Sequence, residues 1–121
     1  MTYLYVFLGG GLGSLARYLV SKASGQYFTT NFPLGTFISN MLACVLLALF
    51  VVLFTSKASE YPWIQPLLIV GFCGGFSTFS TFGNETFQLM DSGNHLLAIL
   101  NIVISIVVGI GLIYLIRLKA A

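Results

Sequence analysis

Charged residues are scarce in this sequence: five lysines and arginines and three aspartates and glutamates among 121 residues, or 7%. A soluble domain carries about 25% charged residues, because such side chains cover the surface that faces water. Hydrophobic residues make up 58% of the chain, and the mean hydropathy is +0.99. The sequence therefore predicts an integral membrane protein, surrounded by lipid, that forms a single domain over residues 1–121.

Other shortages exclude classes of function. The one histidine, His95, lies between apolar segments, and no Ser/His pair, His-Glu cluster or two-carboxylate site is present, which argues against an intramembrane enzyme. Cys44 and Cys73 lie inside apolar runs without metal-ligand spacing, so they are interpreted as small buried side chains. A net charge of +2, scattered along the chain, is too small for binding nucleic acid.

The apolar residues form four runs that are long enough to cross a membrane. A spanning helix needs about 20 mostly apolar residues. The runs predict an all-α protein with four transmembrane helices, at about 3–21, 34–54, 63–89 and 96–116. Turn-forming residues separate them, at Gly25 and 29–33, at 55–62 and at 91–94. In the first helix, Gly9 and Gly13 predict a close approach of another backbone.

The third run contains a glycine-rich and hydroxyl-rich middle. Gly74 and Gly75 weaken a helix there, and Ser77 and Thr78 are good N-caps for a new one. We therefore predict that the third helix breaks near its middle. The alternative is an unbroken helix in which the glycines ease packing. A break at membrane depth must line a polar site or be buried in protein, because free backbone groups have no partner in lipid.

The distribution of positive charge gives only a weak indication of how the chain is oriented in the membrane. With four spans, Lys57, Arg117 and Lys119 lie on one face of the membrane, and Arg17 and Lys22 on the other. Three charges against two predict dual topology, in which copies insert both ways. The alternative is a single orientation set by the first helix or by lipid.

Three motifs resemble the Fluc (CrcB) family of fluoride channels. Residues 9–18 read GGGLGSLARY, residues 35–40 read GTFISN, and residues 71–82 read GFCGGFSTFSTF. The motifs occur in the family's order, and the resemblance covers almost the whole chain. It implies a passive, fluoride-selective channel in the plasma membrane of a prokaryote, built as a dual-topology antiparallel homodimer with two pores.

The resemblance also implies which residues form the sites. Backbone carbonyls of Gly74 and Ser77 from both subunits would hold a central structural sodium ion, Na+. Ser77 stands where the family often has threonine, a harmless change if the carbonyl is the ligand. The fluoride pore would be lined by Asn40, Phe79, Phe82, Ser80 and Thr81, with Arg17 near the vestibule.

The chemistry of these side chains suits an anion. Asn40 supplies an amide NH2, and Ser80 and Thr81 supply hydroxyls. The edge of a phenylalanine ring is electropositive, so an anion can rest against Phe79 and Phe82, which are neighbours on one helical face. The alternative for the rings is a packing ridge.

Two further polar features remain open from the sequence. Glu85 is the only acid well within a span; it either supports the ion path or lies near the interface. Asn101 and Ser105, four residues apart on the fourth helix, form either a polar track or an interhelical hydrogen bond, and the bond is the simpler interpretation.

A small multidrug-type proton-coupled exporter is the alternative function. Such an exporter also has four short helices and inserts both ways, but it needs an acid in its first helix. The first span here has Arg17 and no acid.

Overall fold

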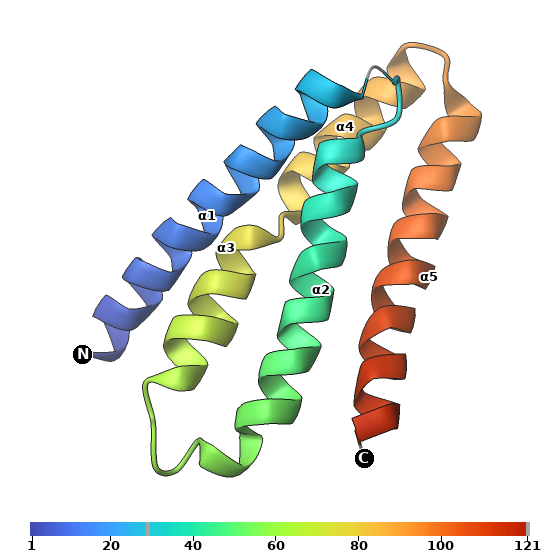
Figure 1. The fold of residues 1–121 in the computed structure, drawn as a ribbon. Coiled ribbons are helices and arrows are strands. Elements are labelled where there is room, and N and C mark those ends of the chain that lie inside the picture. Colours follow the sequence, from blue (N-terminus) through green and yellow to red (C-terminus); the bar gives the residue numbers. More distant parts are fainter. Residues whose placement is uncertain (29, 121) are drawn as a thin grey trace.

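The computed structural model of the protein describes residues 1–28 and 30–120, and most of these are helical (Figure 1). The elements are α1 (Thr2–Tyr27), α2 (Leu34–Phe54), the 3-10 turn η1 (Thr55–Lys57), the π-helical segment η2 (Gln65–Cys73), α3 (Gly74–Phe76), α4 (Phe79–Asp91) and α5 (His95–Ala120). Four helical stretches, at 2–27, 34–57, 65–91 and 95–120, are long and apolar enough to cross a membrane. This confirms the predicted all-α fold with four spans, the third of them broken.

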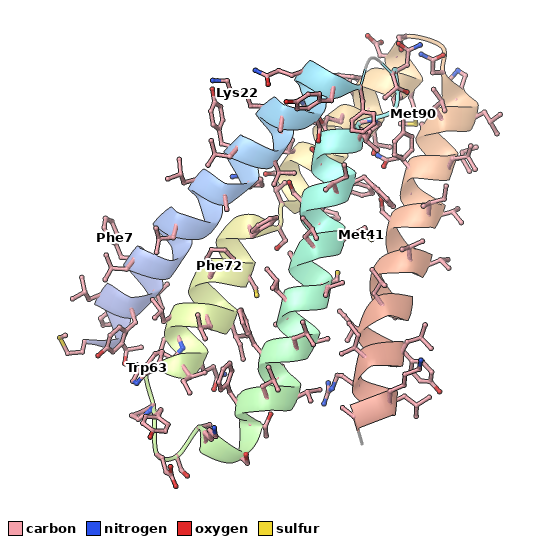
Figure 2. The ribbon with its side chains drawn as sticks, viewed as in Figure 1. Phe7, Lys22, Met41, Trp63, Phe72 and Met90 are labelled. Atoms are coloured by element: carbon pink, nitrogen blue, oxygen red, sulfur yellow. The ribbon has the colours of Figure 1, made fainter. Side chains whose placement is uncertain are left out.

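The helices pack as a bundle with the broken span between its neighbours. Helix α1 lies along η2 and α3, α2 packs against α5, and α4 packs against α5 and also contacts α2. Both termini and the connection after α2 lie at one end of the bundle (Figure 1). Large apolar side chains such as Phe7, which is 76% exposed, point outward from α1 (Figure 2). These outward faces suit contact with lipid tails.

The seam between α1 and the third span depends on glycine. A Cβ added at Gly9 would overlap the carbonyl oxygen of Leu67, and one added at Gly13 would overlap that of Phe72. Both glycines are buried. The predicted close approach of another backbone is confirmed, and the partner is η2.

The turn between the third and fourth spans lies where the sequence predicts it. Gly93 has a positive φ of 88°, and its N–H donates to the Met90 carbonyl at 3.1 Å. The Asn94 N–H donates to the Leu89 carbonyl at 2.8 Å. This is the Schellman arrangement, which satisfies the last carbonyls of a helix and needs glycine at the left-handed position.

The first helix is longer than predicted. Helix α1 continues through Gly25 to Tyr27, so Gly25 is not a break. One glycine costs a helix only about 1 kcal/mol, which neighbouring turns can offset. Of the predicted turn at 29–33, residue 29 lies outside the described residues, and 30–33 connect α1 to α2.

The longer α1 changes the count of positive charges at the two faces of the membrane. Arg17 and Lys22, which the sequence-based count assigned to one face of the membrane, both lie inside α1, and Arg17 lies about 15 Å before its end at 1.5 Å per residue. Only Lys22 is then close to that end of the bundle, against Lys57, Arg117 and Lys119 at the other. The balance is three to one rather than three to two, so the charges favour one orientation more than predicted.

Candidate functional site

The break in the third span lies at Ser77 and Thr78. Both residues have extended backbones, with φ/ψ of −83°/157° and −150°/123°, between the end of α3 and the start of α4. The glycines do not form the break, because Gly74 has helical angles of −63°/−38°. The Thr78 hydroxyl accepts from the Thr81 N–H at 3.2 Å, as an N-cap does. The predicted break and its cap are confirmed, and they lie two and three residues after Gly75.

The break releases the carbonyls of residues 74–77 from helical hydrogen bonds, those of Gly74 and Ser77 among them. In a continuous helix, Thr78 would donate to Gly74, and Thr81 would donate to Ser77. Instead the Thr78 N–H donates to Asn40 Oδ1 at 2.8 Å, and the Thr81 N–H donates to the Thr78 side chain. The Gly74 and Ser77 carbonyls thereby lose their helical partners. These are the two carbonyls that the resemblance assigns to a cation.

Asn40 holds the break in place. Its Oδ1 accepts from the Thr78 N–H, and its Nδ2 donates to the Thr78 carbonyl at 3.2 Å. This pair of bonds replaces the backbone bonds lost where the helix stops. It uses the amide oxygen and one N–H of Asn40, and it leaves the other N–H of the NH2 group for a further acceptor.

Arg17 lies at the end of α3. Its Nε donates to the Gly75 carbonyl at 3.2 Å, and its side chain is half-buried. A cation at a helix C-terminus is favourable, because the last carbonyls carry partial negative charge. Arg17 therefore stabilises the first half of the broken span.

A groove of about 280 Å³ opens beside the break. It is lined by Asn40, Met41, Cys44, Ser77, Thr78, Phe79, Phe82, Ser105 and Ile106. The rings of Phe79 and Phe82 lie with their centroids 5.9 Å apart at an interplanar angle of 43°, and Phe79 is 83% exposed. Thus α2, α4 and α5 together place an amide, hydroxyls and two aromatic rings around one space.

The structure brings together some of the predicted pore residues and not others. Asn40, Phe79 and Phe82 line the groove. Ser80 and Thr81 are outside its lining, and the Ser80 hydroxyl lies 3.5 Å from that of Thr78. Arg17 is also outside the groove, on the Gly75 carbonyl.

A second cavity, of about 180 Å³, adjoins the released carbonyls. It is lined by Ala43, Cys44, Leu47, Ile69, Cys73, Gly74 and Ser77. Cys73 is buried, as predicted, whereas Cys44 is half-buried and lines both cavities. Gly74 and Ser77, whose carbonyls were predicted to hold one cation, therefore line the same cavity.

Glu85 lies in the middle of α4 and lines two polar cavities. One, of about 400 Å³, also contains Gln88 and Asn94; the other, of about 180 Å³, contains Ser21 and Thr36. Its Oε1 atom is buried without a hydrogen-bond partner among residues 1–28 and 30–120. Glu85 is thus placed beside a polar vestibule rather than against lipid.

The fourth span carries a buried polar contact, of which the sequence predicts Asn101 but not its partner on α4. Asn101 Nδ2 donates to Thr86 Oγ1 at 2.9 Å, and Ser105 Oγ donates to Asn101 Oδ1 at 3.3 Å. The interpretation of Asn101 as an interhelical hydrogen-bonding residue is confirmed. Sequence reasoning missed its partner Thr86, because one threonine in a polar helix gives no periodic signal.

The family model and the relatives that match this chain all point to one family. The family described as CrcB-like protein, Camphor Resistance (CrcB), matches residues 4–116. A Flavobacterium psychrophilum protein named fluoride-specific ion channel FluC is 41% identical over 109 residues, which are 90% of this chain and 88% of that protein. Proteins of the same name from Phocaeicola vulgatus and Pyrococcus abyssi are 47% and 44% identical, over 88% and 94% of this chain and 88% and 91% of their own lengths.

Proposed function

This chain belongs to the CrcB-like family of ion channels, which are not enzymes, and we propose that it is a fluoride-selective channel through which fluoride leaves the cytoplasm passively. It is a multi-pass membrane protein of a prokaryote. The observation that carries the proposal is the groove at the helix break, where Asn40 and two phenylalanine rings surround one space.

Fluoride holds its hydration water tightly, so a pore must replace water with strong donors. The remaining Asn40 N–H and the Thr78 hydroxyl are such donors, whereas the Ser77 and Ser105 hydroxyls already donate to the Cys73 carbonyl and to Asn101 Oδ1. The ring edges of Phe79 and Phe82 offer an electropositive surface. Ser80 and Thr81 extend the path beside the groove, and the positive charge of Arg17 draws anions toward the break.

The multidrug-type exporter is not favoured, because the α1 sequence contains no acid that exchanges protons. Expression in bacteria lacking their own fluoride exporter distinguishes the two functions. We expect resistance to fluoride and unchanged sensitivity to cationic drugs. Drug resistance without fluoride resistance would contradict the proposal.

The open face at the break supports pairing with a second copy. Gly74, Ser77, Phe79 and Ser80 are all exposed in the single chain. Irregular backbone at membrane depth is tolerated only when protein or a polar cavity covers it. A second copy in antiparallel orientation would cover both breaks at once and produce two equivalent pores.

Orientation can be tested by adding charge. Two lysines added to the 55–62 connection, or to the connection between α1 and α2, should each lock one orientation. We expect each locked variant to lose fluoride flux alone and the co-expressed pair to recover it. Full flux from one locked variant by itself would rule out an obligatory antiparallel dimer.

The carbonyls freed by the break support a central cation. Gly74 and Ser77 line one cavity, and a two-fold partner would double their oxygens around one point. An unpaired carbonyl in a dry membrane interior costs several kcal/mol, so a bound cation compensates for it. Carbonyl oxygens suit a hard ion, and a monovalent one leaves less excess charge beside an anion path. We propose that this ion is sodium, in a structural role.

Sodium removal tests this site. Exhaustive replacement of sodium by a bulky organic cation should lower fluoride flux, and sodium should restore it. Gly74→Val should weaken both cation binding and fluoride flux. A Cβ at Gly74 meets nothing within 4 Å in its own chain, so the effect would come from a clash with the partner subunit. Gly111→Val, at an equally open position of α5, is the control. Undiminished flux without any bound cation would contradict the proposed role.

A further inference from the structure

The break leaves α4 without helical continuity to α3, so other contacts must fix where it sits. Just before its first residue, at the N-cap Thr78, the anchor is the pair of hydrogen bonds with Asn40 of α2. One such point still allows α4 to swing about Thr78. The placement of the rings that follow, Phe79 and Phe82, therefore depends on a second point further along the helix.

The second point is the contact of Thr86 with Asn101 of α5. The Thr86 hydroxyl donates to the Phe82 carbonyl at 2.8 Å and accepts from Asn101 Nδ2 at 2.9 Å. Asn101 Oδ1 in turn accepts from Ser105, a residue that lines the groove. Thr86 is 6% exposed and Asn101 1% exposed, so lipid and water are excluded from the contact.

We propose that Thr86 and Asn101 are positioning residues that hold the second half-helix against α5 and so set the place of the Phe79–Phe82 pair in the groove. The inference rests on the proposed fluoride channel. Both rings lie between the anchors at Thr78 and Thr86, on about two turns of helix. The chain of bonds also reaches the backbone of Phe82 itself, through its carbonyl.

In this row of hydrogen bonds each side chain has a defined role as donor or acceptor. Asn101 presents its NH2 to Thr86 and its oxygen to Ser105, and the threonine hydroxyl has only one hydrogen, which it gives to Phe82. Thr86→Val keeps the shape and leaves the Asn101 NH2 without its partner. Thr86→Ser keeps the hydroxyl and loses only a methyl group. The two variants separate hydrogen bonding from packing.

The test measures fluoride flux and ring position in the same reconstituted protein. With 4-fluorophenylalanine at position 82, we expect the fluorine resonance to shift in Thr86→Val and to stay near wild type in Thr86→Ser. Fluoride flux per protein should fall about three- to tenfold in Thr86→Val, the range that interhelical hydrogen bonds in membranes give. In Thr86→Ser, flux should stay within about twofold of the wild-type value. Asn101→Ala should lower flux similarly, and adding Thr86→Val to it should cause little further loss.

Several outcomes would overturn the inference. Equal flux and an unshifted resonance in Thr86→Val would show that the contact does not place the ring. Additive losses in the double variant would show that the two residues act separately. If Thr86→Val does not assemble, Thr86→Ala against Thr86→Ser carries the same comparison. A wild-type protein without fluoride flux would defeat the channel proposal, while the resonance shift would still decide the positioning role.

Discussion

Replacing either ring of the groove by isoleucine should abolish most fluoride transport while leaving the fold intact. Phe79→Ile and Phe82→Ile keep an apolar side chain and remove the electropositive ring edge that we propose faces the ion. Phe79 is 83% exposed, so few contacts within its own chain are lost. We expect flux to fall by about tenfold or more in each variant, since each 1.36 kcal/mol of lost stabilisation is tenfold in rate.

The control for these variants is Phe7→Ile. Phe7 is also a highly exposed phenylalanine, but it points outward from α1, away from the break (Figure 2). Its replacement should leave flux unchanged. Wild-type flux in both groove variants would show that the two rings serve packing alone.

The glycines of α1 should be the least replaceable residues of the fold. Even Gly9→Ala or Gly13→Ala places a Cβ into a backbone carbonyl of η2, and a carbonyl held in a helix cannot turn away. Forcing atoms into a packed seam typically costs about 1–3 kcal/mol, and a rigid backbone allows less relief than a side chain. We expect little folded protein from the double variant and a lowered unfolding temperature in each single one.

Gly11 provides a matched comparison on the same helix. A Cβ at Gly11 meets nothing within 4 Å, so Gly11→Ala should leave the yield and the unfolding temperature near wild type. Equal stability of the Gly11 and Gly13 variants would mean that α1 does not pack against η2 as described.

The sequence predicted the membrane class, the four spans and the break, because each depends on local signals. Apolar run length fixed α2 at Leu34–Phe54, as predicted, and the Ser77-Thr78 cap marked the start of α4. The end of α1 was wrong, because the glycine at position 25 resembles a stop and the helix passes through it. That error also placed Arg17 too near the end of the first helix, whereas its Nε donates to the Gly75 carbonyl inside the bundle.

The site was predicted in part, and what was not predicted are the tertiary contacts between helices. Motif resemblance pointed to Asn40 and the two rings, which do share one groove. Nothing in the sequence indicated that Asn40 binds the backbone of Thr78 on both sides, or that Thr86 meets Asn101. Such contacts join residues 15 to 38 positions apart, and their partners are decided by how the helices pack.

Fluoride efflux from liposomes that contain only the purified protein tests the central claim most directly. Vesicles are loaded with sodium and potassium fluoride, and efflux is started by a potassium ionophore that relieves the charge imbalance, without a pH gradient. The channel account predicts rapid fluoride release that depends on the ionophore, and no comparable release of chloride from matched vesicles. Absence of fluoride release, or equal release of chloride, would contradict it.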